Sequence, residues 1–255
     1  MLSLSRYRFA TRAAGIHCIC SVVVALLAAW IVFGIWYPYP YGELAGGQQL
    51  FLLVVSVDVV CGPLLTFVIF NPKKRRRELI ADLGLVALIQ VAALGYGLGS
   101  VWQARPIYLV HEVERFRVIA APDIDVEQLN ALPGNLKPEF WAGPKVVDIR
   151  SPKSIEERNT ILFAAATGGR DYGARPDFYI PYDSVAGEAA LRRAKPLTAF
   201  LEKQPLQQDT AKKLAINKGA TVEQWFYLPV VGREDWVAIL DKRGQIQGFL
   251  KGDGF

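Results

Sequence analysis

A stretch in the first third of the chain limits what it can fold into. Residues 58–77 read DVVCGPLLTFVIFNPKKRRR, an apolar run that stops at five consecutive cations. Membrane-spanning helices end this way on the cytoplasmic side of a bilayer, where Lys and Arg are retained. The stretch predicts a membrane span followed by a topogenic cytoplasmic cluster of cations, Lys73, Lys74, Arg75, Arg76 and Arg77.

Two further apolar runs, 14–36 and 83–102, have lengths near the ~20 residues that a helix needs to cross a bilayer. The chain therefore predicts three transmembrane helices and a long tail. A cleaved signal peptide is the alternative for the first run. That run is too long for a signal sequence, however, and it ends in the aromatic stretch 36–41, WYPYPY, without a small-residue cleavage site. We therefore expect it to stay as an anchor.

Orientation follows from the cations beside the spans. The N-terminal flank contains Arg6, Arg8 and Arg12, whereas the loop 37–49 contains no Lys or Arg. The positive-inside rule then predicts a cytoplasmic N-terminus and a region beyond about Gln103 that is periplasmic in a bacterium with two membranes. The expected domains are a cytoplasmic flank (1–13), a three-helix transmembrane domain (14–102) and a periplasmic domain (103–255).

The net charge of +5 belongs mainly to the membrane part, which has eight Lys or Arg and four acids before Gln103, against 21 and 20 after it. The basic pI is thus a topogenic signal and predicts no nucleic-acid partner. All three cysteines, Cys18, Cys20 and Cys61, fall in apolar runs. Their spacing fits no common zinc site, so we expect no metal and no cofactor.

Asp58 falls near the middle of the second span, where a charge costs at least several kcal/mol unless it is neutral or partnered. Gln90 has a similar depth in the third span. A hydrogen bond from its amide to the Asp58 carboxyl is one expectation, which would give Asp58 a structural role. The alternative is that Asp58 meets a polar group of another membrane protein. Gly62-Pro63 lies one turn further on, where a kink would open a lateral groove.

Three other features of the spans predict contacts. Gly95 and Gly99 form a small-xxx-small face for close approach of a helix, either of this chain or of a partner. His17, near the cytoplasmic end of the first span, is expected to extend toward the interface. Asp82 is placed to balance the cationic cluster or to favour the start of the third helix.

The region after the spans predicts a mixed α/β domain of the α+β type, with a small antiparallel sheet and helices on one side. The expected strands are 107–119, as one strand or two, 145–149, 224–231, 235–240 and 245–250. The expected helices are 122–132, 151–167, 184–201 and 209–217, with interruptions at Pro196 and Pro205. Asp123 or Asp125 is expected to cap the first of these helices, and Pro152 with Glu156 and Glu157 marks the start of the second.

This region contains no residues in a spacing typical of catalysis. Its only histidine is His111, inside a strand pattern, and it has no cysteine or phosphate-binding loop. We therefore predict no catalytic residues and no enzyme. The loop 171–182 is rich in Tyr and Pro, and it is either a protein-binding surface or a segment packed on the sheet.

An ordered set of residues resembles the type IV pilin accessory proteins of the TfpX/TfpZ kind, strongly over residues 1–120 and more loosely beyond. The set comprises Tyr7-Arg8-Phe9, Pro40, Gly42, Asp58, Gly62-Pro63-Leu64-Leu65-Thr66, Asn71-Pro72-Lys73, Glu78-Leu79, Asp82-Leu83, Gln90, Tyr96-Gly97 and Ala104-Arg105-Pro106. The resemblance implies an inner-membrane protein that promotes assembly or surface display of type IV pili.

The partners implied by the resemblance are the major type IV pilin, the pilus assembly machinery and the lipid bilayer. The family has no established active site. Two other functions are less favoured by the sequence. A small transporter subunit would need more polar residues than one intramembrane acid unless it oligomerises, and a pilin-modifying enzyme would need acidic catalytic clusters and more spans. We therefore expect a chaperone-like accessory protein.

Overall fold

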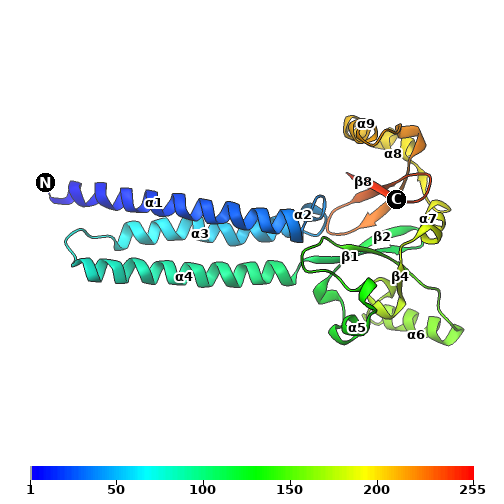
Figure 1. Ribbon diagram of the computed structural model, residues 1–255, viewed down its shortest axis with the longest axis horizontal. Coiled ribbons are helices and arrows are strands. Elements are labelled where there is room, and N and C mark those ends of the chain that lie inside the picture. The colour runs from blue at the N-terminus through cyan, green and yellow to red at the C-terminus, as the bar shows by residue number, and fades with distance from the viewer. Residues whose placement is uncertain (1) are drawn as a thin grey trace. The chain divides into compact units, whose positions relative to one another are not determined.

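The computed structural model describes residues 2–255, with side chains from residue 6 onward. The chain forms two compact units (Figure 1). One comprises the residues up to Tyr39 together with Gly47–Gln103, and the other comprises Pro40–Gly46 together with Ala104–Phe255. A short stretch between two apolar helices therefore belongs to the second unit.

The first unit is built from α1 (Leu2–Ile31), a π-helical turn η1 (Val32–Trp36), α3 (Gly47–Ile69) and α4 (Arg76–Gln103). Within the described residues, three helical segments are long and apolar enough to cross a membrane: 6–36, 47–69 and 76–103. This confirms the three predicted apolar helices. The first and third extend further toward the N-terminus than their apolar runs, because Arg and Ala in the flanks favour helix.

Aromatic residues join the helices of the first unit at one end. The hydroxyl of Tyr37 donates to the carbonyl oxygen of Val101 at 3.0 Å, and the rings of Trp36 and Trp102 lie 5.0 Å apart. Amphipathic rings of this kind gather where a membrane helix reaches the bilayer interface. The end of η1 is thus held against the end of α4.

The second unit contains one mixed sheet with strand order β4-β3-β1-β2-β6-β7-β8, in which β5 also pairs with β6. Its strands are β1 (Pro106–Glu112), β2 (Arg115–Ala120), β3 (Lys145–Ile149), β4 (Tyr179–Pro181), β5 (Lys195–Pro196), β6 (Phe226–Val231), β7 (Trp236–Leu240) and β8 (Ile246–Lys251). The expectation of an antiparallel sheet was wrong, because β1 pairs with β3 and β2 with β6 in parallel. Long connections between these strands allow the parallel pairing.

The helices of this unit are α5 (Val126–Ala131), α6 (Ile155–Ala166), α7 (Ser184–Leu191), α8 (Leu197–Lys203) and α9 (Gln208–Asn217). Asp125 caps α5, as predicted, by accepting from the N–H of Glu127. The interruption predicted at Pro196 within 184–201 is confirmed, because Lys195 and Pro196 pair with β6 and separate α7 from α8. Pro196 lacks the N–H that a continuous helix would need.

Helices cover both faces of the sheet, which corrects the one-sided expectation. Tyr227 and Val237 pack with α8 and α9 on one face. Leu228 and Ala238, which alternate with them along the same strands, pack with Ala190 of α7 on the other face. Both sides of the central strands are therefore buried, in keeping with the continuous apolar sequence of β7.

Residues 40–46, here called the strap, form part of the core of the second unit. Leu44 of α2 (Tyr41–Leu44) is 0% exposed and packs among Phe116, Leu228 and Trp236. The N–H of Arg233 donates to the carbonyl oxygen of Leu44 at 2.7 Å. These residues lie in a predicted loop of the transmembrane domain, and no sequence pattern predicts their packing against the sheet.

Ion pairs hold the strap as well. Lys251 of β8 lies 2.9 Å from Glu43 and 2.6 Å from Glu234. Hydrogen bonds to these two carboxylates raise the pKa of Lys251. The strap is therefore fixed both by an apolar side chain in the core and by a charged group at the sheet edge.

The loop 171–182 packs on the sheet, which decides between its two interpretations. The hydroxyl of Tyr179 donates to the carbonyl oxygen of Gly173 at 2.6 Å, and that of Tyr182 to Gly244 at 2.7 Å. Burial raises the pKa of both tyrosines. Phe178 is 0% exposed, so most of the aromatic side chains of this loop serve packing.

The start of α6 makes a testable pH-dependent contact. Ser154 caps the helix, and Arg150 donates two hydrogen bonds to Glu157 at 2.9 and 3.1 Å. The Arg150 hydrogen bond lowers the pKa of Glu157 to about 2. Because the pKa of Glu157 is lower in the folded state, its ionised carboxylate stabilises the fold at pH values above the unfolded-state pKa. This stabilisation is lost as pH falls through the folded-state pKa.

Arg150→Ala is therefore expected to make α6 open more readily at neutral pH. The hydrogen-exchange protection of the α6 amides should also depend less on pH between about 5 and 2 than in the unmodified protein. Hydrogen exchange of the α6 amides across this range measures both effects. Arg158→Ala is the matched control, because Arg158 is next to Glu157 in α6 and has no ion pair within the described part of the chain. Equal changes in the two variants would contradict the role of the Arg150–Glu157 pair.

Candidate functional site

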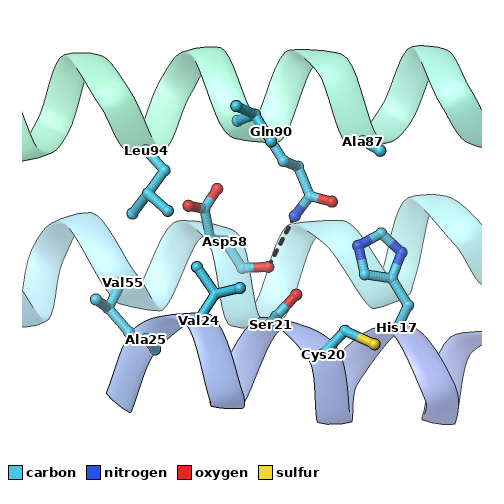
Figure 2. Close-up of a pocket in the computed structure, with 11 residues that line it drawn as sticks. His17, Cys20, Ser21, Val24, Ala25, Val55, Asp58, Ala87, Gln90 and Leu94 are labelled. Atoms are coloured by element: carbon cyan, nitrogen blue, oxygen red, sulfur yellow. Dashed lines mark hydrogen bonds between the residues drawn. The ribbon is translucent and has the colours of Figure 1, made fainter. Parts of the chain in front are cut away.

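A cavity of about 140 Å³ lies between α1, α3 and α4 of the first unit. Its polar lining comes from all three helices, with His17 and Ser21 on α1, Asp58 on α3 and Gln90 on α4 (Figure 2). The rest of the lining is mostly apolar and includes Val24, Val55, Val91 and Leu94. This mostly apolar cavity is the strongest candidate site here, because four polar side chains from three helices meet in it and polar groups inside an apolar bundle are costly.

The carboxylate of Asp58 is the charged group of this cavity. Figure 2 shows it directed toward α4, between Gln90 and Leu94. Over residues 6–255, no side chain or backbone group forms a hydrogen bond or ion pair with this carboxylate. The hydrogen bond predicted between the Asp58 carboxyl and Gln90 is therefore absent from the described residues.

Gln90 does contact Asp58, but through the backbone. Its side-chain Nε2 donates to the carbonyl oxygen of Asp58 at 3.0 Å. The contact depends on Gly62, since a Cβ atom there would lie 2.0 Å from Nε2 of Gln90. Because Gly62 exposes the α3 backbone, the amide bonds to the helix itself and leaves the carboxylate free. Pro63 does not line the cavity.

Gly62→Ala is expected to displace the Gln90 amide and to remove this interhelical hydrogen bond, at a cost of about 1 kcal/mol. Thermal unfolding of the detergent-purified protein measures the loss. Gly84→Ala, on α4, is the matched control because a Cβ there meets no atom within 4 Å. The double variant Gly62→Ala with Gln90→Ala should lose no more thermal stability than Gln90→Ala alone. An additive loss would show that Gly62 acts independently of Gln90.

His17 corrects another expectation. Its Nδ1 lies 2.6 Å from the hydroxyl of Thr66, whose side chain is only 2% exposed. The imidazole therefore joins α1 to α3 and does not extend along α1 toward the interface. Thr66 follows Pro63 in α3, and a hydroxyl in an apolar helix favours such a polar partner.

The glycines of α4 divide into two groups. A Cβ at Gly97 would lie 2.4 Å from Val54, so Gly97 permits the close approach of α3. Gly95 and Gly99 have no atom within 4 Å of their Cβ positions. The predicted glycine face thus makes no contact with another helix of the described chain, and a contact with a partner is the alternative that remains.

The cationic cluster follows α3 and enters α4. Lys73, Lys74 and Arg75 lie between the helices, whereas Arg76 and Arg77 are the first residues of α4. Lys74 forms an ion pair of 2.5 Å with Asp82. Asp82 therefore partly balances the cluster, as the sequence predicts.

The second unit contains one buried polar pair that the sequence did not reveal. Nδ1 of His111, which is 2% exposed, lies 2.9 Å from Asp148 on the neighbouring strand β3. The parallel pairing of β1 with β3 places the two residues opposite each other. Among the described residues, no group of three His, Cys, Asp or Glu side chains could hold a metal ion.

Comparison with known proteins finds relatives along the whole chain. Residues 5–46 match the family described as fimbrial assembly protein FimB. The chain is 36% identical over 261 residues to the fimbrial assembly proteins of Dichelobacter nodosus serogroups I and E1, covering 100% of this chain and 99% of each relative. The chain belongs to the fimbrial assembly protein FimB family.

Another member of the fimbrial assembly proteins, from D. nodosus serogroups C1 and C2, is 41% identical over 128 residues and covers 50% of this chain. No solved structure matches the chain. The FimB match ends at Gly46, which is also the last residue of the strap. Residues 5–46 therefore include most of α1 together with the segment that packs into the sheet domain.

Proposed function

We propose that this protein is an accessory protein of the bacterial inner membrane that binds the major type IV pilin and promotes its assembly into pili and their surface display. Full-length similarity to fimbrial assembly proteins carries the proposal. Its relatives are named as assembly proteins, which supports a chaperone-like role without catalysis or a cofactor. Within this group we propose the TfpX/TfpZ kind, on the ordered residues given above.

The proposed orientation has the N-terminus and the cationic cluster in the cytoplasm and the sheet domain in the periplasm, acting with the pilus assembly machinery. It rests on eight cations in the flanks of the apolar helices and on none between α1 and α3. A pilin is expected to wait in the same membrane as one apolar helix with a periplasmic head. Both parts of this protein would then be available to it.

We propose that the pilin helix docks beside α3 and α4. The unpartnered Asp58 carboxylate supports this position, since a polar group at that depth stabilises a complex that supplies its partner. Gly95 and Gly99 have open space for a close helix. Because two ionised acids repel, the pilin would have to offer Asp58 an amide, an amine or a protonated group.

Site-specific photo-crosslinking tests the dock. Crosslinkers at Val91 and Gly95 should give adducts with pilin, whereas one at Leu26 of α1, which is 65% exposed, should give adducts with lipid only. Adducts at Val91 and Gly95 that contain only lipid or the protein's own helices would count against the dock.

Surface and total pilin in a deletion strain test the function itself. Loss of surface pili that return when the retraction motor is also removed would show that the protein favours extension over retraction. Loss that persists while total pilin is normal would show a need during assembly. Unchanged surface pilin would refute the proposed function, and ion flux in liposomes would then test the transporter alternative.

A further inference from the structure

The chain enters the second unit at one edge of its sheet. α4 ends at Gln103 and β1 begins at Pro106, so the start of β1 is at most about 11 Å from the end of α4. The strap, which lies between η1 and α3 in the sequence, bonds to Arg233 in the turn 232–235 between β6 and β7. That turn lies at the same edge, because β2 ends beside Pro106 and β6 runs parallel to β2. Both connections to the apolar helices are therefore at this edge, here called the tether edge.

The loop 138–144, PEFWAGP, lies at the tether edge as well. It leads directly into β3, which begins at Lys145. β3 pairs with β1 in parallel, with Lys145 opposite Tyr108. Because parallel neighbours start at the same edge of a sheet, β3 and the loop before it share the edge at which β1 begins.

Both ends of this loop are fixed to the domain. Before it, the hydroxyl of Tyr108 donates to the carbonyl oxygen of Leu136 at 2.8 Å, and Leu136 is buried. After it, Nζ of Lys145 donates to the carbonyl oxygens of Asn135 and Lys137, each at 3.0 Å. The loop is therefore closed at its base, so its tip is held in place on the tether edge.

Two adjacent aromatic side chains form the tip. Trp141 is 70% exposed and Phe140 is 49% exposed. Their rings contact each other edge to face, with centroids 4.5 Å apart. Apolar side chains of this size are costly to leave in water, and Trp in particular concentrates where a bilayer meets water. The pair therefore suits a surface that contacts the interface of a bilayer.

The charges around the tip limit how deep such a contact can be. Glu139 is the one charged residue of 138–144, and it lies 3.6 Å from Lys145. Lys137, just before the loop, is exposed. Two lysines and one glutamate leave little net charge, so attraction to anionic lipid is not what would hold the loop. Because charged groups are costly in hydrocarbon, the contact is restricted to the interfacial layer, roughly 5–8 Å thick on each side of the core.

We propose that the loop 138–144 is a further membrane contact of this protein, in which Phe140 and Trp141 enter the interfacial layer of the bilayer that the three apolar helices cross. The bilayer is the occupant that the chain itself brings within reach, because the start of β1 cannot be far from the end of α4. The aromatic pair would restrict rotation of the sheet domain about the short connection 104–105. The proposal needs the helices to span a bilayer, but it is independent of pilin binding.

Lipid-borne quenchers test the contact in the full chain. Cys18, Cys20 and Cys61 are replaced by Ala, and Ala142→Cys, beside the aromatic pair, carries an environment-sensitive fluorophore in nanodiscs of phosphatidylcholine. Val113→Cys with the same fluorophore is the matched control, because Val113 is 56% exposed in the turn between β1 and β2, at the opposite edge of the sheet. Phosphatidylcholine with a nitroxide near the headgroup should quench the label at position 142 at least about twofold more than the label at position 113.

The double variant Phe140→Ser with Trp141→Ser should lower the quenching at position 142 to the level of position 113, with little change in thermal stability because both side chains are exposed. Raising the salt concentration should leave the quenching unchanged, because the contact is apolar. Equal quenching of the two labels, or quenching that persists in the double variant, would overturn the proposal. Quenching at position 142 by water-soluble iodide alone would also overturn it, in favour of a surface that faces water or a protein partner. The deletion-strain experiment on pili is separate, so its outcome does not affect this test.

Discussion

Asp58→Leu is expected to reduce surface pilin about tenfold while leaving the protein at least as stable as the unmodified chain. The carboxylate has no partner among residues 6–255, and an unpartnered polar group in an apolar medium destabilises the fold. Leucine removes that cost. The pilin, however, would lose an interhelical contact of about 1–2 kcal/mol, which corresponds to roughly tenfold in affinity.

Surface pilin sheared from cells, and thermal unfolding of the purified protein, measure the two effects separately. Ser56→Leu is the matched control, because Ser56 is an exposed polar residue of the same helix that bonds only to the backbone oxygen of Leu53. It should leave pilus display unchanged. A destabilised Asp58→Leu protein with normal pili would show that Asp58 has a structural role.

Leu44→Ala is expected to lower the free energy of unfolding of the sheet domain by about 2–5 kcal/mol, the usual cost of emptying a well-packed core site. Leu44 is 0% exposed and contacts side chains of β2, β6 and β7. Gly232 also packs directly on its carbonyl oxygen. The effect should appear in the sheet, although Leu44 lies between two apolar helices in the sequence.

Hydrogen exchange of β6, β7 and β8 in the full-length protein measures this loss. Leu206→Ala is the control, since Leu206 is 94% exposed in the same domain and surface truncations change stability by at most about 0.5 kcal/mol. Unchanged protection of these strands in the Leu44 variant would show that the strap is not needed for the stability of the sheet.

Many features of this protein were predictable because local signals determine them. The three apolar helices follow from run length alone, since a bilayer requires ~20 apolar residues in each helix. The cap of α5 by Asp125 also depends on neighbours in sequence. At the candidate site, the sequence singled out Asp58 and Gln90 by their depth in an apolar run, because a polar residue there is conspicuous without a structure.

The remaining features depend on residues far apart in the chain. No local pattern pairs β1 with β3 or β2 with β6 in parallel, so the sheet was expected to be antiparallel. Gln90 bonds to a carbonyl oxygen because Gly62, 28 positions earlier, lacks a side chain.

The sequence by itself determined which segments are apolar helices, where the cations lie and which polar residues are buried among apolar ones, because length, charge and composition set these. The tertiary structure alone decided that the Asp58 carboxylate has no partner within the described chain and that Gly97, rather than Gly95 or Gly99, contacts α3. It also decided that residues 40–46 complete the core of a domain that begins at Ala104. The physical reason is that packing selects among many contacts that local sequence permits equally.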